Sequence, residues 1–303
     1  MTTELPELQE LLIRREEGIP ASWDFEPTAG IVILLTGADR SAIEQTPWSD
    51  FLAKTLSRYP ETENPVHFST PLGGRAATVS VADAIPTFKA LTLARKVIGP
   101  LLSERPSELT VISFLNDDLS AALGEALLAA VHAALFQLPR ISGTPPTQKT
   151  LEAIHFYGAG FQQADFEHVK ATAEGNNLAR WLTHLPGNYL TPGIYRGLTE
   201  TLAKKEGWET HFYDRDELER LGAGAFLSVV EASPVRDAGI LHLKYRPDGA
   251  EGKPLALVGK GICFDTGGSN LKVSGSMLGM HGDMQGSAVA LGAFLAITRL
   301  EVS

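Results

Sequence analysis

Two lysines and two aspartates lie close together near the end of this 303-residue chain, among seven glycines. They are Lys260, Asp265, Lys272 and Asp283, and they follow the apolar run 255–258. Glycine lets the backbone approach a ligand closely, and carboxylates suit hard or borderline cations. A lysine at the end of a buried strand can lose its proton and act as a ligand or an electrophile. The cluster therefore indicates metal-dependent chemistry.

Each of the four residues also has an ordinary explanation. Lys260 could extend its ammonium group into water, Asp265 could cap a turn, and the other two could be solvated, as most charged side chains are. Taken singly, each residue is better explained in this way. Taken together, within 24 residues and among glycines, they favour a functional site.

The composition excludes several other classes of protein. The hydrophobic content of 44% fits a globular protein, and the net charge of −10 makes nucleic acid an unexpected partner. A single cysteine, Cys263, rules out an internal disulfide framework and fits a reducing compartment. No signal peptide and no apolar run of membrane-spanning length are found. We therefore expect a cytoplasmic protein without a membrane partner.

Residues 1–160 alternate between strand-like and helix-like segments, which predicts an α/β domain with a largely parallel sheet. Short apolar runs indicate strands, and leucine or alanine at three- and four-residue steps indicates helices. The expected strands are 31–35, 77–81, 110–115 and 153–157, and the expected helices are 88–98 and 119–136. Asn116 is the expected N-cap of the second helix.

A second α/β series is expected after residue 160. It opens with a linker helix over about 162–185, after the loop-like stretch 141–150. The expected helices are 192–206, 215–221 and 286–298, and the expected strands are 209–213, 225–230, 240–245 and 255–258. The predicted domains are thus 1–160 and 161–303.

The cluster also has a specific resemblance. The segment Lys260-Gly-Ile-Cys-Phe-Asp265-Thr-Gly-Gly-Ser-Asn-Leu-Lys272, followed eleven residues later by Asp283, resembles the leucyl aminopeptidase (M17) family of dinuclear metallopeptidases. Segments 177–192 and 221–233 resemble the linker and the strand before the catalytic core of that family. The resemblance extends from about residue 175 to the end, whereas over 1–160 it rests on domain order alone.

The resemblance implies a fold, an activity and a set of site residues. The implied architecture is an N-terminal α/β domain plus a three-layer α/β/α metallopeptidase domain, assembled as a homo-hexamer. Lys260, Asp265 and Asp283 match metal ligands, with Asp265 bridging two divalent ions, Mn²⁺ or Zn²⁺. Lys272 matches the catalytic lysine, and Met280 matches a residue of the pocket for the first side chain of the peptide substrate.

The chain also departs from the family pattern. The family completes its site with a later Asn-Thr-Asp-Ala-Glu-Gly-Arg segment, which supplies further ligands and an arginine that holds bicarbonate. No such segment occurs before Ser303, so we expect an incomplete catalytic domain and an inactive chain as given. Asn270 and His281 also differ from the commonest family pattern. His281 could support Asp283, although a solvated histidine is the better explanation.

Two readings of function follow. The first is a metal-dependent aminopeptidase that releases N-terminal residues from peptides. The alternative is a truncated, non-catalytic relative that acts as a binding or assembly protein, and its support is the missing ligands. Metal-dependent hydrolysis by the complete protein distinguishes the two. A nucleic-acid role is a distant third because of the charge balance.

Overall fold

The computed structural model describes residues 5–37, 41–44, 46–59, 64–82, 84–140 and 151–301. The chain divides into two compact units. The sheet unit comprises Leu8–Phe136 and Thr144–Lys170, and the helical unit comprises Ala171–Ser303 with Met1–Glu7 and Gln137–Gly143. The expected loop 141–150 lies outside the described residues.

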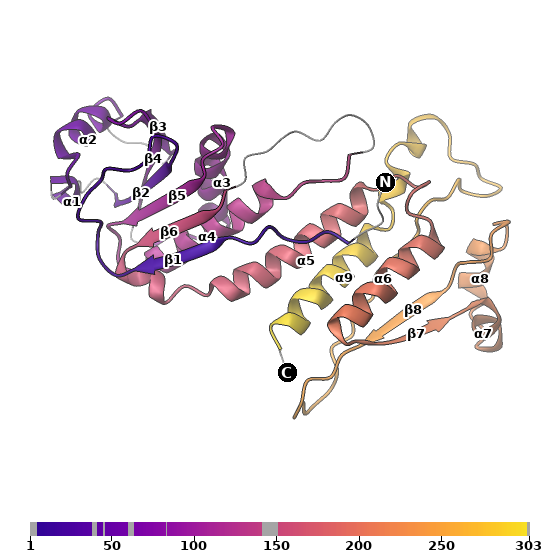
Figure 1. Ribbon diagram of the computed structural model, residues 1–303. Coiled ribbons are helices and arrows are strands. Elements are labelled where there is room, and N and C mark those ends of the chain that lie inside the picture. Colours follow the sequence, from indigo (N-terminus) through magenta and orange to yellow (C-terminus); the bar gives the residue numbers. More distant parts are fainter. Residues whose placement is uncertain are drawn as a thin grey trace. The chain divides into compact units, whose positions relative to one another are not determined.

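The sheet unit is built on a six-stranded sheet (Figure 1). Its spatial order is β1-β6-β5-β2-β4-β3, and all neighbours are parallel except β3 with β4. The strands are β1 (Leu12–Glu16), β2 (Gly30–Thr36), β3 (Val66–Ser69), β4 (Arg75–Val81), β5 (Glu108–Ser113) and β6 (Ala153–Tyr157). Parallel neighbours need crossover connections, and helices supply them.

Strand β2 lies inside the sheet and is buried on both faces, which explains its unbroken apolar sequence. Successive side chains of a strand point to opposite faces. Val32 and Leu34 therefore join one core cluster, while Ile31, Ile33 and Leu35 join another. A single strand thus links the two hydrophobic cores of this unit.

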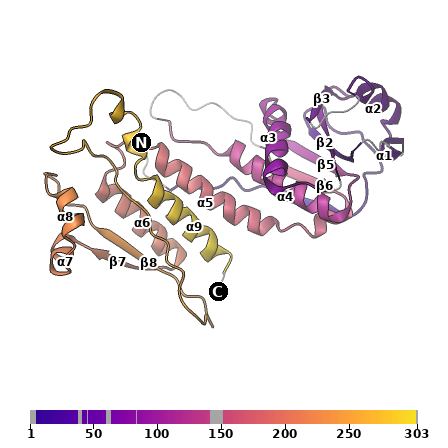
Figure 2. The same cartoon turned by 180° about the vertical axis from the view of Figure 1, so that it is seen from behind.

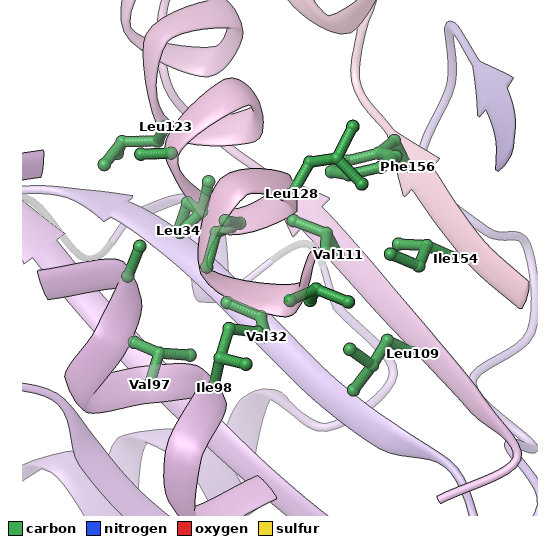
Figure 3. Close-up of a cluster of buried hydrophobic side chains, with 14 of the residues drawn as sticks. Val32, Leu34, Val97, Ile98, Leu109, Val111, Leu123, Leu128, Ile154 and Phe156 are labelled. Atoms are coloured by element: carbon green, nitrogen blue, oxygen red, sulfur yellow. The ribbon is translucent and has the colours of Figure 1, made fainter. Parts of the chain in front are cut away.

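Helices cover both faces of the sheet. Helices α3 (Thr87–Ser103) and α4 (Asp117–Leu135) pack against the cluster in Figure 3, and α1 (Ser41–Glu44) and α2 (Ser49–Leu56) contribute to the other cluster. The Asn116 side chain accepts a hydrogen bond from the Leu119 amide at 2.9 Å, as an N-cap does. The expected mixed α/β fold with a largely parallel sheet is confirmed.

Helix α4 is long and apolar enough, by length and composition alone, to cross a membrane. No apolar run of membrane-spanning length was expected from the sequence, and Glu125 lies within this helix. Half of the apolar window is buried inside the structure, and core helices pass the same test. We therefore assign α4 to the core of the sheet unit.

Every strand and helix expected within residues 1–160 is present, within a few residues of its expected ends. Strands β1 and β3 were not predicted. β1 is an edge strand with the sequence Leu-Ile-Arg-Arg-Glu and a single half-buried residue, so it shows no alternation of apolar and polar residues. β3 has only four residues. Both strands depend on pairing with a neighbour rather than on their own composition.

His132 makes the stability of the sheet unit depend on pH. This α4 side chain is 6% exposed, and burial, followed by the charge of Lys170, lowers its pKa from 6.5 to about 4. The unfolded chain therefore binds one more proton than the folded protein between these pH values, and stability falls as the pH drops. The expected loss is about 1.4 kcal/mol per pH unit.

Urea unfolding across this pH range, followed by hydrogen exchange in β2 and β5, measures the effect of His132. The His132→Gln variant should lose most of the slope between pH 6.5 and about 4. His67→Gln, on the exposed side of β3, is the matched control and should keep the slope. An unchanged slope in His132→Gln would show that other groups cause the acid sensitivity.

In the helical unit, α5, α6 and α9 run side by side in both views (Figure 1 and Figure 2). Their bounds are α5 (Phe166–His184), α6 (Pro192–Glu206) and α9 (Gln285–Arg299). Helix α5 begins in the sheet unit and enters the helical unit at Ala171. The antiparallel pair β7 (Glu209–Tyr213) and β8 (Ile240–Lys244) follows, with α7 (Arg215–Arg220) and α8 (Gly224–Val230) between them in the chain.

The contact between α5 and α9 depends on two glycines and one arginine. A Cβ atom at Gly175 would lie 2.2 Å from the carbonyl oxygen of Gly292, and one at Gly292 would lie 2.3 Å from that of Gly175. At the end of α9, Arg299 is paired with Glu174 of α5 and, at 2.6 Å, with Glu206 of α6. The two backbones are therefore in direct contact, and an ion-pair network joins all three helices.

Two strands expected in this unit are not formed. Residues 225–230 belong to helix α8, because a short apolar run does not by itself distinguish a strand from a helix. Residues 255–258 have no regular secondary structure and pair with no strand among the described residues, and Val258 is 96% exposed. The other helices and strands expected between 192 and 298 are present. Lys260 therefore follows an exposed segment, not a buried strand.

Candidate metal centre

The structure places the four predicted charged residues on three neighbouring pieces of the helical unit. Lys260 follows the exposed irregular segment 255–258, and Asp265 and Lys272 lie on the glycine-rich loop that comes next. Asp283 comes directly after the short 3₁₀ helix η3 (Met280–Gly282) and just before α9. The four residues therefore lie in irregular segments and at a helix start, where ligand-binding residues are often found.

The glycine-rich loop is closed by its own backbone. Gly267 and Gly268 have φ values of +94° and +72°, which side-chain-bearing residues rarely adopt. The Lys272 amide donates a hydrogen bond to the carbonyl oxygen of Thr266 at 2.8 Å, which closes the turn. The Gly267 amide donates to Asp265 Oδ1 at 2.9 Å. The turn thereby brings the Lys272 ammonium onto the same Oδ1 atom.

The surroundings of Asp265 favour its ionised form. The hydrogen bond from Lys272 is the largest cause, and it lowers the pKa of Asp265 below its usual value. The charge of Lys272, the Gly267 amide and the charge of Lys260 lower this pKa further, against a partial penalty from burial. Asp265 is therefore held as a carboxylate that interacts with both lysines.

Lys260 reaches Asp283 across the first turn of α9. Its Nζ lies 2.9 Å from Asp283 Oδ2, and its carbonyl oxygen accepts a hydrogen bond from the Ser287 amide at 2.8 Å. This crossing is tight, because a Cβ at Gly259 would lie 2.4 Å from the Cα of Ser287. Gly286 is close as well, with the Lys260 amide nitrogen 3.2 Å from where its Cβ would be. The glycines on both sides let the two backbones meet.

A partly buried layer supports the segment that carries Lys260. Cys263 is 6% exposed, and burial, followed by the charge of Asp237, raises its pKa to about 11. The thiol therefore stays protonated and is a packing residue. Asp237 accepts a hydrogen bond from the Gly193 amide, at the start of α6, at 2.9 Å. Tyr195, one turn into α6, reaches Ser287 Oγ at 3.1 Å.

The remaining predicted residues have different environments. Met280 is 8% exposed and lies in η3, within three residues of Asp283. His281 is half-buried, and Asn270 is exposed. The Phe264 ring packs against Gly187, where a Cβ atom would lie 3.1 Å from the ring. The turn after α5 therefore contacts the loop that carries Asp265.

The donor set suits divalent cations only if lysine takes part. Among the residues that the structure describes, no group of three or more histidine, cysteine, aspartate or glutamate side chains is placed to hold a metal ion. Asp265 and Asp283 offer carboxylate oxygens, and Lys260 offers an amine once it loses its proton. Lys260 contacts Asp283 and also lowers the pKa of Asp265. Lys260 therefore links the two predicted carboxylate ligands, through an ion pair with Asp283 and through its charge on Asp265.

Sequence reasoning missed the supporting residues. Ser287 lies four residues after Asp283, which is the spacing of neighbours on a helix and could have marked it. Tyr195 and Asp237 are separated from the cluster by more than twenty residues and belong to ordinary polar segments, so nothing in the sequence pointed to them.

Comparisons with known proteins agree with these observations. Residues 177–303 match the "Cytosol aminopeptidase family, catalytic domain". A "Probable cytosol aminopeptidase" of Synechococcus elongatus is 34% identical over 224 residues, which is 74% of this chain and 42% of the relative. A protein of the same name from Nostoc punctiforme is 34% identical over 215 residues, which is 70% of this chain and 43% of the relative.

A solved structure shares the fold. "Tomato leucine aminopeptidase mutant - K354E" superposes with a TM-score of 0.79 and 20% sequence identity, covering 99% of this chain and 62% of that chain. The family match and the two relatives assign the chain to a class of aminopeptidase-related proteins, and the structural match shows the shared fold. The chain belongs to the cytosol aminopeptidase family, also called leucyl aminopeptidases or peptidase family M17. It spans less than half the length of the two curated relatives.

Proposed function

We propose that this chain supplies part of the active site of a metal-dependent aminopeptidase, which hydrolyses N-terminal residues from peptides at a two-metal site. The observation that carries the proposal is the meeting of Lys260 with Asp283 and of Lys272 with Asp265 in one loop region. Membership in an aminopeptidase family supports the reaction and the peptide substrate. The names of the relatives support a cytoplasmic location.

Lys260, Asp265 and Asp283 are the residues that we propose as ligands. When bound, two divalent ions, Mn²⁺ or Zn²⁺, would polarise the substrate carbonyl and activate a water molecule at neutral pH. Both hydrogen bonds that described residues make to Asp265 end on Oδ1, so Oδ2 is available to a cation. Lys260 can bind a cation only as the neutral amine, because an ammonium group has no lone pair.

Lys272 has a different role in this proposal. Its ammonium group is held beside Asp265, and its side chain is 28% exposed, so it is positioned by the protein yet accessible to a substrate. A protonated lysine there would stabilise the negative charge that develops on the carbonyl oxygen. We further propose that Met280 lines the pocket for the first side chain. Bicarbonate as a general base and a hexameric assembly are proposed for the complete protein from the family resemblance.

Binding of Mn²⁺ tests the ligand assignment directly. Isothermal titration calorimetry should show saturable binding to the wild-type protein. Asp265→Asn and Asp283→Asn should each weaken binding by more than the roughly 10–100-fold typical of residues that merely support a ligand. Asp248→Asn is the matched control, because it makes the same charge change at an exposed position of the helical unit.

The outcomes separate the candidate functions. Loss of affinity confined to the Asp265 and Asp283 variants supports the metallopeptidase site. A wild-type protein that does not bind Mn²⁺ or Zn²⁺ overturns it and favours the non-catalytic binding or assembly protein. Equal affinity in all three variants would place the ions elsewhere in the chain.

A further inference from the structure

We infer that Tyr195 and Ser287 form a positioning pair that holds the backbone of Lys260 and the backbone next to Asp283 at one fixed spacing. Neither side chain reaches the proposed ligands, so the pair acts through the main chain and is not catalytic. The consequence for metal binding rests on the proposed function. The positioning itself is a property of the protein without metal and can be measured without one.

Ser287 makes hydrogen bonds to the backbone on both sides of the Lys260–Asp283 ion pair. Its amide donates a hydrogen bond to the carbonyl oxygen of Lys260 at 2.8 Å, which fixes the Lys260 backbone. Its hydroxyl donates to the carbonyl oxygen of Met284 at 2.7 Å, and Met284 is the residue after Asp283. Ser287 therefore fixes the backbone of Lys260 and the backbone next to Asp283, and the side chains of these two residues meet at 2.9 Å.

The direction of the hydrogen bonds follows from proton counting. A serine hydroxyl has one proton, and Ser287 uses it on the Met284 carbonyl. The Tyr195 phenol must then be the donor in the 3.1 Å contact with Ser287 Oγ. Burial, the largest cause, raises the pKa of Tyr195 to about 12, so the phenol keeps the proton that it donates. The chain of donors runs from Tyr195 to Ser287 to Met284.

Tyr195 is itself fixed by the start of α6. Its amide donates to the carbonyl oxygen of Thr191 at 2.9 Å, and Asp237 accepts from the Gly193 amide at 2.9 Å. The Thr191 side chain also caps this helix by accepting from the Ile194 amide, so the phenol extends from a well-held helix start. Hydrogen bonds of this supporting kind orient ligands and tune the affinity of a metal site.

The backbone beside Lys260 packs closely against Ser287. A Cβ at Gly259 would lie 2.4 Å from the Ser287 Cα. The segment before Lys260 has no strand beside it among the described residues, and Val258 is 96% exposed. The contact with the start of α9 therefore constrains the segment next to Lys260.

The first test uses the protein without metal. The Ser287 amide donates to the carbonyl oxygens of both Lys260 and Met284, at 2.8 and 3.0 Å, so its hydrogen exchange reports on the two backbones that the pair holds. Tyr195→Phe removes only the phenol, and Ser287→Ala removes the hydroxyl but keeps the amide. Exchange of the residue 287 amide should be about three- to tenfold faster in both variants, as expected for the loss of one or two hydrogen bonds. If the residue 287 amide exchanged at the wild-type rate in both variants, the inference would be overturned.

The second test measures the affinity for Mn²⁺ by calorimetry. Each variant should bind about tenfold more weakly than the wild type, the lower end for supporting residues. The double variant should bind no more weakly than Ser287→Ala alone, because both changes break the same chain of hydrogen bonds. Additive losses in the double variant would show that Tyr195 and Ser287 act separately and would overturn the pair.

Matched controls lie elsewhere in the helical unit. The Ser228 hydroxyl donates to the carbonyl oxygen of Ala225 at 2.9 Å, three residues earlier, which is the same local bond that Ser287 makes. Ser228→Ala and Tyr213→Phe should leave both exchange at residue 287 and the affinity for Mn²⁺ unchanged. If the wild type binds no metal but exchange responds as expected, the proposed function fails and the positioning stands.

Discussion

Replacing Lys272 with methionine in the complete protein is expected to lower kcat by about 10²–10³-fold, the usual cost of removing one group that stabilises an oxyanion. Methionine keeps an unbranched stem of similar length but has no ammonium group. Lys272 meets Asp265 through its ammonium group alone, so the loop that is closed by backbone hydrogen bonds should persist. Assays of peptide hydrolysis at saturating Mn²⁺ would measure the change.

The affinity for Mn²⁺ provides the contrast that identifies a catalytic lysine. In the structure, the Lys272 ammonium pairs with the Asp265 carboxylate and lowers the pKa of Asp265. A cation bound to Asp265 would have to compete with that ammonium, so Lys272→Met should keep its Mn²⁺ while losing activity. Lys253→Met, at an exposed position of the same unit, is the control. Parallel losses of affinity and activity would instead make Lys272 a residue that maintains the metal site.

Replacing Gly292 with alanine is expected to destabilise the helical unit by about 3 kcal/mol, toward the upper end for overpacking. The added Cβ would lie 2.3 Å from the carbonyl oxygen of Gly175, a backbone atom that cannot rotate away. Helices α5 and α9 would have to separate, although Arg299 remains paired with Glu174 at one end. Urea unfolding and hydrogen exchange of the α9 amides would measure the loss.

The matched control for this prediction is Gly197→Ala in α6. Nothing lies within 4 Å of a Cβ at that position, so alanine adds no contact. Alanine is favoured over glycine in a helix by about 0.5–1 kcal/mol, and the variant should be as stable as the wild type or more so. The same substitution is thus expected to act with opposite signs in two helices. If Gly292→Ala were equally well tolerated, the close approach of α5 and α9 would be wrong.

The sequence by itself predicted features whose cause is local or carried by one continuous segment. The apolar run 31–35 became a strand because both of its faces are buried, and Asn116 became an N-cap because its side chain bonds to the next turn. The family motif from Lys260 to Lys272 could be identified because its spacing lies within one loop.

Only the tertiary structure decided the features that depend on a distant partner. The edge strand β1 exists because it pairs with β6, whereas residues 255–258 remain unpaired because no described strand lies beside them. The close approach of Gly175 and Gly292 joins helices more than a hundred residues apart. Tyr195 meets Ser287 across ninety-two residues. A strand ladder, a backbone contact and a hydrogen bond between side chains each need two segments to meet, and one segment's composition does not encode its partner.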